Sequence, residues 1–232
     1  PDGPRPPVAS GRGERCAFAL SRRATAELRA LARREGATPF AVLLVGVQAL
    51  LARYAGTDDV VVGAPVAGRN RRETEGLIGF FVNTLALRTD LSGDPTVGEL
   101  VARARGGVLD AHEHQDVPFE KLVEELAPER SLQHTPLFQV MFALQDAGRE
   151  RLRLGAVDAE PLPAAADEVK FDLAVVLGEA EGRLGGTLAW RAELWDRATM
   201  ERMAGHLATL LEALPADPGR RLSDVGCLPE AE

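Results

Sequence analysis

The stretch TPFAVLLVGVQALLARYAGTDDVVVGAPVAGRN, residues 38–70, decides the fold class of this chain. Thr38 is a favourable N-cap, and Pro39 suits the first helical position because an N–H there has no helical partner to lose. Apolar residues then recur every three or four positions as far as Tyr54, which predicts a well-buried helix. Val60 to Ala64 is a continuous apolar run, typical of a strand that is buried on both faces. A buried helix followed by a buried strand indicates an α/β fold.

The rest of the chain surrounds this stretch with further helices and strands. Helices are indicated by apolar spacings of three and four, and strands by β-branched or alternating runs between turn residues. The predicted elements are, in chain order, a strand at 14–20, a helix from Ser21 to Gly36, the helix at 38–54, strands at 60–64 and 80–88, helices that start at Asp94-Pro95 and at Pro118, strands at 137–145, 151–158, 170–178 and 183–193, and a final helix capped by Asp196.

Composition narrows the class of protein. The chain has 232 residues, 45% of them hydrophobic, which suits one globular domain or a large subdomain. No apolar run reaches the roughly 18 residues of a membrane span. The net charge of −8 argues against nucleic acid as a partner, because phosphates attract lysine and arginine.

The two ends of the chain give further expectations. Residues 1–13 are rich in proline and glycine and resemble a linker rather than a signal peptide or a membrane anchor. Cys16 and Cys227 lack the spacing of a zinc site or of a disulfide framework. We therefore expect a reducing, cytoplasmic setting and no metal.

Five segments resemble, in order and spacing, the motifs of one known family. The five segments are VVVGAPVAGRN (60–70), EGLIGFFVNTLALR (75–88), AHEHQDVPFEKLVEEL (111–126), TPLFQVMFALQD (135–146) and EVKFDLAVVL (168–177). On these segments the chain, from about Arg15 onward, resembles the C-terminal lobe of a condensation domain of nonribosomal peptide synthetases. The tail RLSDVGCLPEAE (221–232) is similar to the linker that leads into an adenylation domain.

The resemblance implies a fold and a division of the chain. Condensation domains have two lobes similar to chloramphenicol acetyltransferase, with a tunnel between them. We therefore expect a two-layer α/β sandwich in which helices pack on one face of a mixed β-sheet. Residues 14–216 would form the C-terminal lobe, preceded by the linker at 1–13 and followed by a linker toward an adenylation domain at 217–232.

The resemblance also implies an activity and partners. The family forms peptide bonds by transferring an acyl group from one carrier-protein phosphopantetheine thioester to the amine on another. The implied partners are the N-terminal lobe, the donor and acceptor carrier proteins and the downstream adenylation domain. No cofactor is expected to bind to the lobe itself, because the phosphopantetheine is presented by the carrier proteins.

The catalytic histidine of the family lies in an HHxxxDG motif, which does not occur in this sequence. His112 and Asp116 reproduce only the HxxxD spacing, because Ala111 stands in place of the second histidine and Val117 in place of the glycine. A β-branched valine does not readily adopt the tight backbone geometry that glycine allows. The segment is explained instead as the family's HQDVPFE block, in which Pro118 starts a helix. We therefore predict no catalytic residue in this chain and no condensation by the isolated chain.

Four residues are candidates for lining the tunnel. Arg69 matches an arginine that is thought, in the family, to pair with the aspartate of HHxxxDG, and a guanidinium–carboxylate pair fixes geometry well. Asn83 would lie on a tunnel-facing strand and orient the thioester or amide group of the substrate by hydrogen bonding. An equally good explanation is that the Asn83 side chain forms hydrogen bonds with backbone groups of its own lobe. Gln145 and Asp146 end the strand that contains PLFQVMF, and Asp146 stands where many relatives have asparagine.

Two other functional classes stay open on the sequence. One is a free-standing acyltransferase of the chloramphenicol acetyltransferase type, which has about this length. The other is a non-catalytic condensation-like domain that recruits a tailoring enzyme.

The strand that crosses to the partner lobe is expected within 155–182. In this segment Phe171, Leu173, Val175 and Leu177 alternate as in a half-buried strand. Unpaired strand edges invite pairing with another chain. In the isolated chain we therefore expect 155–182 to be poorly ordered or to cause self-association.

Overall fold

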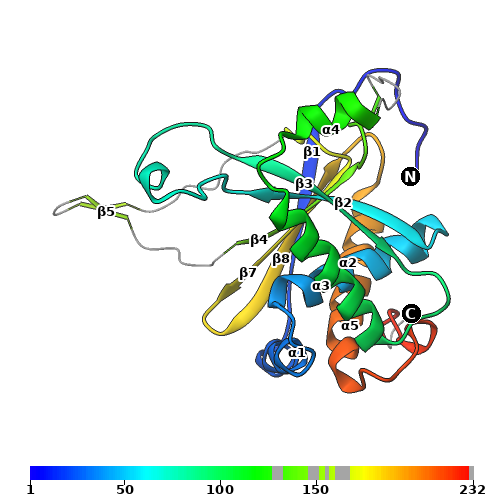
Figure 1. The fold of residues 1–232 in the computed structure, drawn as a ribbon. Helices are drawn as coiled ribbons and strands as arrows, with labels where there is room; N and C mark the ends of the chain where they lie inside the picture. The colour runs from blue at the N-terminus through cyan, green and yellow to red at the C-terminus, as the bar shows by residue number, and fades with distance from the viewer. Residues whose placement is uncertain (127–132, 146–151, 155–156, 160–167, 230–232) are drawn as a thin grey trace.

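The described residues form five α-helices, eight strands and three short 3-10 helices, Arg72–Thr74, Leu214–Ala216 and Leu222–Asp224. The computed structural model describes residues 1–126, 133–145, 152–154, 157–159 and 168–229 (Figure 1). The helices are α1 (Arg22–Arg34), α2 (Pro39–Ala55), α3 (Val97–Glu113), α4 (Phe119–Leu126) and α5 (Arg197–Ala213). The strands are β1 (Gly13–Ala19), β2 (Asp59–Val66), β3 (Asn83–Asp90), β4 (Val140–Gln145), β5 (Leu152–Leu154), β6 (Val157–Ala159), β7 (Leu173–Ala180) and β8 (Arg183–Arg191).

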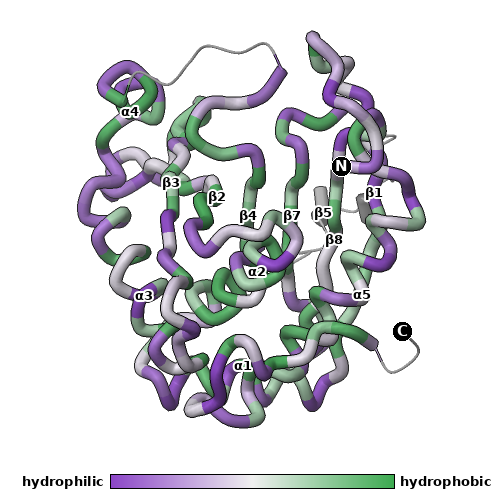
Figure 2. Tube along the Cα trace, turned by 90° about the vertical axis from the view of Figure 1, so that its right-hand side faces the viewer, coloured by the Kyte–Doolittle hydropathy of each residue, from purple (hydrophilic) through white to green (hydrophobic). Residues whose placement is uncertain are grey.

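Six of the strands form one mixed sheet in the order β1-β8-β7-β4-β2-β3. Strands β2, β4 and β7 run parallel to one another, whereas the pairs β2–β3, β7–β8 and β1–β8 are antiparallel. Helices α1, α2, α3 and α5 cover one face of the sheet, the face that Figure 2 turns toward the viewer. The prediction of a mixed sheet with helices on one face is confirmed.

The core lies between the sheet and this helical layer. In β7, Leu173, Val175 and Leu177 are buried under the helices, while Ala174 and Val176 are half-buried on the opposite face. Helix α2 is buried on nearly all sides, because α1, α3 and α5 pack beside it and the sheet lies below it. Apolar residues recur every second position along the strands and every three to four positions along the helices. Their buried side chains pack together in a single core.

The helix starts follow local capping chemistry. Helix α3 begins at Val97, slightly later than the predicted start at Asp94-Pro95, because Thr96 and Glu99 form a capping box. Asp196 occupies the N-cap position of α5 as predicted, but its side chain makes no capping hydrogen bond within the described part of the chain. Among the described residues, no single helix is long and apolar enough to cross a membrane, and only the bent pair of α1 and α2 would reach that length and composition together.

Three strands start later than the sequence predicted, each behind an aromatic residue. Strand β3 starts at Asn83, β4 at Val140 and β7 at Leu173. The aromatic rings two residues before these starts pack against side chains outside the strand ladder. Phe81 lies against Arg69, and the rings of Phe138 and Phe171 contact each other. The predicted strand at 151–158 is instead a two-stranded hairpin formed by β5 and β6.

Strands β2 and β4 are joined through a single residue pair, Gly63 with Met141. The Phe138 ring lies over Gly63, where a β-carbon would overlap it. Phe138 is 2% exposed, and its ring lies 5.3 Å from that of Phe119 and 5.8 Å from that of Phe171, measured between centroids. This aromatic cluster therefore packs the two halves of the sheet together at the point where one bridge joins their backbones.

The N-terminal residues 1–13 are attached to the lobe by a buried ionic cluster. Arg5 forms a bidentate ion pair with Asp172, and one of its two hydrogen bonds measures 2.9 Å. Arg191 approaches the same carboxylate at 3.3 Å, and both Asp172 and Arg191 are buried. The expected linker thus packs along the sheet, and its connection to a preceding domain stays a prediction.

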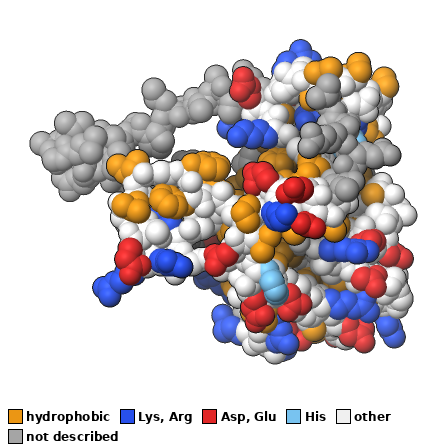
Figure 3. Space-filling model, turned by 45° about the horizontal axis from the view of Figure 1, so that its top comes forward, with side chains coloured by type: hydrophobic (Ala, Val, Ile, Leu, Met, Phe, Trp, Pro, Cys, Tyr) orange, Lys and Arg blue, Asp and Glu red, His pale blue; other side chains and the backbone are white. Residues whose placement is uncertain are grey.

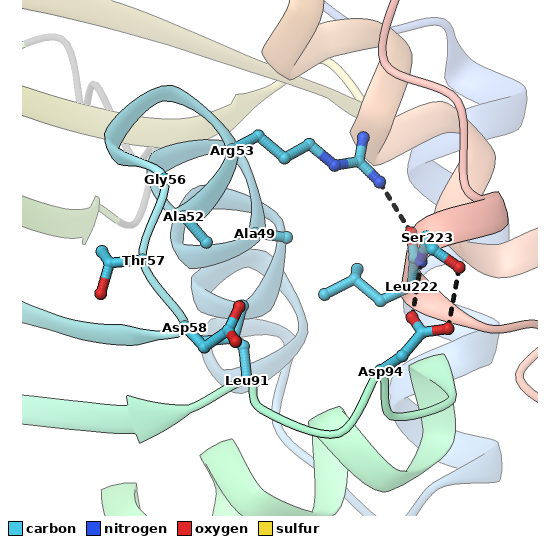
Figure 4. A pocket seen from close by; sticks show the side chains of 10 residues that line it. All are labelled: Ala49, Ala52, Arg53, Gly56, Thr57, Asp58, Leu91, Asp94, Leu222 and Ser223. Carbon is cyan, nitrogen blue, oxygen red and sulfur yellow. Dashed lines mark hydrogen bonds between the residues drawn. The ribbon is translucent and has the colours of Figure 1, made fainter.

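The C-terminal residues close one end of the helical layer. Leu222 and Val225 are buried, and Arg53 of α2 donates hydrogen bonds to both of their carbonyl oxygens at 2.7 Å. Ser223 donates its N–H and its hydroxyl to Asp94, at 2.9 and 2.8 Å, which lowers the pKa of that carboxyl. These contacts border an open hollow of about 470 Å³ beside the end of α2 (Figure 4). Residues 217–229 are therefore packed on the lobe.

The expectation that 155–182 crosses to a partner or drives self-association is wrong for its second half. Strand β7, Leu173–Ala180, is a central strand that pairs with β4 on one side and with β8 on the other. Because both of its edges are occupied within its own sheet, it is not free to pair with another chain. Residues 155–156 and 160–167 lie outside the described residues, so the expectation is not tested there.

Candidate functional site

The carboxyl ends of β2, β4 and β7 meet at one edge of the sheet, because the three strands are parallel. From β2 the chain continues to β3 on one side, and after β4 the next strand of the sheet is β7 on the other side. Two neighbouring parallel strands whose connections lead to opposite sides form a topological switch point. Open α/β sheets bind ligands in the crevice outside the carboxyl ends of the strands at such a point. Two of the predicted site residues lie here, because Arg69 follows β2 and Gln145 ends β4.

Arg69 orders the loop between β2 and β3. Its guanidinium donates to the carbonyl oxygen of Leu77 at 3.0 Å and lies 4.6 Å from the centre of the Phe81 ring. Gly68 permits this arrangement, because its φ is +64° and the Phe81 carbonyl occupies the place of a β-carbon. Gly68, in the segment VVVGAPVAGRN, therefore forms a turn that sets Arg69 at the base of the loop.

Asn83 holds the turn between α3 and α4. Its amide donates to the carbonyl oxygens of Gln115 and Val117, each at 2.8 Å, and its oxygen accepts from the Phe119 N–H at 3.1 Å. It also shares its strand face with Leu85, which is buried under the helices. The tunnel-facing role of Asn83 stays a prediction. Of the two roles that the sequence left open, the contacts favour the one in which the amide satisfies backbone groups.

Gln145 is the exposed last residue of β4. It lies in register with Gly178 of β7, on the sheet face opposite the helical layer. Its neighbours on that face are small or half-buried, among them Ala143 and Val176. Asp146 lies outside the described residues, so its tunnel role stays a prediction.

The histidines near the end of α3 occupy the molecular surface. His112 is exposed on the last turn of α3, and the Nδ1 atom of His114 lies 2.8 Å from the Asp110 carbonyl oxygen. Asp116 accepts a hydrogen bond from the Asn70 amide at 2.7 Å, which ties the β2–β3 loop to the turn after α3. Asp116 thus orders a loop. Among the described residues, no three histidine, cysteine, aspartate or glutamate side chains are grouped to hold a metal ion.

Both cysteines are free thiols, and each is half-buried. Burial raises the pKa of the Cys16 thiol, and the nearby Glu201 carboxylate raises it further. The protonated thiol is a poor nucleophile. Cys16 therefore has the environment of a structural residue rather than of a catalytic one.

A cavity of about 300 Å³ opens at the switch point between β2 and β4. Its walls come from α2, α3, β2, β3 and β4, and include Ala64, Val66, Ala143 and Leu144. His112 is the single polar side chain among the described residues that line it. No local sequence signal marks this cavity, because its walls come from elements that are far apart in the chain.

The loop between β2 and β3 exposes large apolar side chains. Ile78 and Phe80 are almost fully exposed, and Leu77 and Val82 are about half exposed. Figure 3 shows apolar side chains gathered on the projecting part of the molecule. Soluble monomers rarely leave such a group bare, so a contact with another surface is expected here.

Comparison with known proteins gives the family. Residues 1–232 match the family described as Condensation domain. The chain belongs to the condensation domain family. A linear gramicidin synthase from Brevibacillus parabrevis is 47% identical over 233 residues, which cover 100% of this chain and 3% of that protein. Chondramide synthase from Chondromyces crocatus is 43% identical over 231 residues, which cover 100% of this chain and 6% of that protein.

Solved structures of other condensation-type domains share the fold. The four-domain nonribosomal peptide synthetase holo-AB3403, solved with AMP and glycine, matches with a TM-score of 0.91 and 26% identity, over 99% of this chain and 19% of that one. The X-domain from teicoplanin biosynthesis, solved in complex with OxyB, matches with a TM-score of 0.90 and 33% identity, over 99% of this chain and 51% of that one. The mixed sandwich described above is thus the chloramphenicol acetyltransferase-like fold of condensation domains.

Proposed function

We propose that this chain is the C-terminal lobe of a condensation domain that forms amide bonds between carrier-tethered aminoacyl or peptidyl thioesters. One observation carries the proposal: the chain aligns over nearly its whole length with 51% of the X-domain chain, and it contains no HHxxxDG motif. In this proposal, the catalytic histidine comes from an N-terminal lobe. Residues 14–216 supply one wall of the tunnel and part of the acceptor carrier docking surface.

The N-terminal lobe is the partner that best fits the exposed loop between β2 and β3. This loop projects from the edge of the sheet where the proposed tunnel residues lie, and Figure 1 shows β5 projecting to the same side. Its own contacts, from Arg69 to Leu77 and from Asn70 to Asp116, order it before any partner binds. A pre-ordered apolar loop loses little entropy on docking, which supports a stable contact between lobes.

The remaining partners follow from the same assignment. Donor and acceptor carrier proteins would each present a phosphopantetheine thioester to the tunnel, and residues 217–232 would lead to an adenylation domain. The net charge of −8 agrees with a protein that handles tethered thioesters rather than nucleic acid, and the assignment to a peptide synthetase implies a cytoplasmic location. Gln145 and Asp146 would face this tunnel from the end of β4.

The first prediction is that the isolated chain forms no peptide bond, whereas a chimaera does. In the chimaera, this chain replaces the 233 aligned residues of the linear gramicidin synthase, whose upstream segment is expected to supply HHxxxDG. Dipeptide formation from loaded carrier proteins is measured by mass spectrometry for both proteins. Turnover by the isolated chain that His112→Ala abolishes would contradict the proposal, as would an inactive chimaera that is folded and still binds both carriers.

The second prediction concerns Arg69 as a positioning residue. In the chimaera, Arg69→Ala is expected to lower kcat about 100-fold, because the aspartate of HHxxxDG loses the guanidinium that fixes it. The KM for both loaded carriers is expected to stay unchanged, and Arg69→Lys is not expected to restore kcat, because lysine lacks the bidentate fork. Arg71→Ala, an exposed change in the same loop, serves as the control. Equal losses for Arg69→Ala and Arg71→Ala would refute this role.

A second candidate function is recruitment of a tailoring enzyme by a non-catalytic condensation-like domain. It is favoured by the match to the teicoplanin X-domain, which is solved in complex with OxyB. Binding of this chain to OxyB, measured by biolayer interferometry, together with an inactive chimaera would support recruitment. An active chimaera and no binding to OxyB would support condensation.

A further inference from the structure

We propose that Arg5 is a positioning residue for condensation, because it fastens the N-terminal residues 1–13 to the segments that lead into β4 and β7. In this way Arg5 fixes the direction in which the upstream lobe is attached to this one. The role rests on the proposed function, since it takes the polypeptide upstream of this chain to be the N-terminal lobe. Arg5 lies outside the tunnel and acts through the arrangement of the lobes.

Four segments of the chain meet at the carboxylate of Asp172. Arg5 donates to both of its oxygens, and Arg191, the last residue of β8, lies 3.3 Å from one of them. Both arginines also donate to the carbonyl oxygen of Gln133, Arg5 at 3.2 Å and Arg191 at 2.8 Å. Asp172 directly precedes β7, and Gln133 lies in the segment that leads into β4. Arg5 therefore contacts the chain just before two central parallel strands.

Burial and geometry make this contact directional. The Asp172 and Arg191 side chains are almost fully buried, and that of Arg5 is 26% exposed. A bidentate guanidinium–carboxylate pair fixes the relative orientation of its two partners as well as their distance. Arg191 approaches a single oxygen of Asp172, so the bidentate contact of Arg5 is the one that orients the N-terminal segment.

The contacts on either side of Arg5 attach the segment as a strap. On the upstream side, the Asp2 carboxylate accepts a hydrogen bond from the Asp196 N–H, at the start of α5, at 2.8 Å. On the downstream side, the Gly11 carbonyl oxygen accepts from the Val169 N–H, also at 2.8 Å. Asp2 is exposed, so water competes for its contact. Arg5 makes the next attachment after the upstream lobe, to a carboxylate that is buried.

A small movement at Arg5 is magnified at the proposed tunnel. Asp172 lies at the amino end of β7, whereas Gln145 lies at the carboxyl end of the parallel neighbour β4. Strand β7 has 8 residues, and at about 3.3 Å per residue it spans roughly 26 Å. A rotation of about 10° at one end of such a span moves the other end by roughly 4 Å, and a misplacement of about 1 Å can cost a reaction 100-fold.

The test compares kinetics and lobe geometry in the chimaera. Arg5→Ala is expected to lower kcat about tenfold and to leave the KM for both loaded carriers unchanged, because the tunnel walls are displaced and the docking surfaces are not. Double electron–electron resonance measures the distance between the lobes. One spin label is attached at Asp110→Cys, exposed on α3, and the other on the surface of the upstream lobe, after replacement of the native cysteines. Arg5→Ala is expected to broaden this distance distribution.

Two further variants separate positioning from a general effect on folding, which circular dichroism monitors. Arg5→Lys keeps the charge beside Asp172 but loses the bidentate contact, so a smaller loss of kcat is expected. Arg88→Ala removes a bidentate pair with Asp59, at 2.8 and 2.7 Å, that joins β3 to β2 and does not involve the strap. This control is expected to change neither kcat nor the distances.

Three results would overturn the role of Arg5. They are an unchanged kcat for Arg5→Ala, equal losses of kcat for Arg5→Ala and Arg88→Ala, and a loss of kcat with an unchanged distance distribution. Failure of the proposed function is distinguishable from these. A folded but inactive chimaera in which Arg5→Ala still broadens the distances would contradict the proposed condensation activity and support the strap.

Discussion

Asp172→Asn is expected to lower the free energy of unfolding by about 3 to 5 kcal/mol, because it leaves buried arginine charge without its counter-ion. The Asp172 side chain is 4% exposed and that of Arg191 is 7% exposed, and Arg5 joins them from the N-terminal segment. Asparagine keeps the shape of the side chain but removes the charge that both guanidinium groups face. Urea unfolding followed by circular dichroism measures the change.

Two further variants separate this effect from a general loss of charge. Asp59→Asn breaks an exposed pair with Arg88 and is expected to change the stability little, since water screens that pair. Arg5→Ala is expected to cost less than Asp172→Asn, because Arg191 stays paired with Asp172. A loss for Asp172→Asn as small as that for Asp59→Asn would show that the buried cluster does not stabilise the lobe.

Gly63→Ala is expected to cost about 3 kcal/mol through overpacking, since the added carbon overlaps the Phe138 ring. The ring cannot move aside easily, because it is buried and packs against Phe119 and Phe171. For a chain of this length, the loss corresponds to a fall in Tm of about 6 to 12 °C. Thermal unfolding measured by calorimetry checks the value.

The control for this substitution is the same exchange at an open glycine. Gly106 lies inside α3, and no atom beyond its own helix lies within 4 Å of a β-carbon built there. Gly106→Ala is therefore expected to stabilise the chain by about 0.5 to 1 kcal/mol, the helix preference for alanine. In the double variant Gly63→Ala/Phe138→Leu, the smaller side chain should remove part of the clash. A double variant that simply sums the two single losses would refute this explanation.

The local features of the fold were predictable from the sequence. The helix after Thr38 and the alternation in β7 are set by neighbouring residues, whose periodicity gives each element its type and its buried face. The start of the chain was less predictable. Pro and Gly in residues 1–13 indicate an extended path, but the attachment of Arg5 to Asp172 joins positions far apart in the sequence.

The candidate site was predictable only in part. Arg69 could be selected because it ends a recognisable motif, and the structure places it at the edge where parallel strands end. Asn83 could not be oriented, because the strand begins at Asn83 itself and the groups that it binds belong to the turn after α3. The apolar cavity had no sequence signal. An alanine such as Ala64 or Ala143 occurs equally in a filled core and beside a cavity, so the residue type does not distinguish the two.

The sequence by itself determined the α/β class, the order of the elements and the five motifs of the condensation family, because these depend on local periodicity, capping and residue identity. The tertiary structure alone decided that β7 is a central strand, that β2 and β4 meet at one bridge, and that Asn83 turns toward the helices. The physical reason is that strand pairing and side-chain contacts depend on partners distant in the chain. A local pattern fixes which face of a strand is apolar, but it does not say which strand lies beside it.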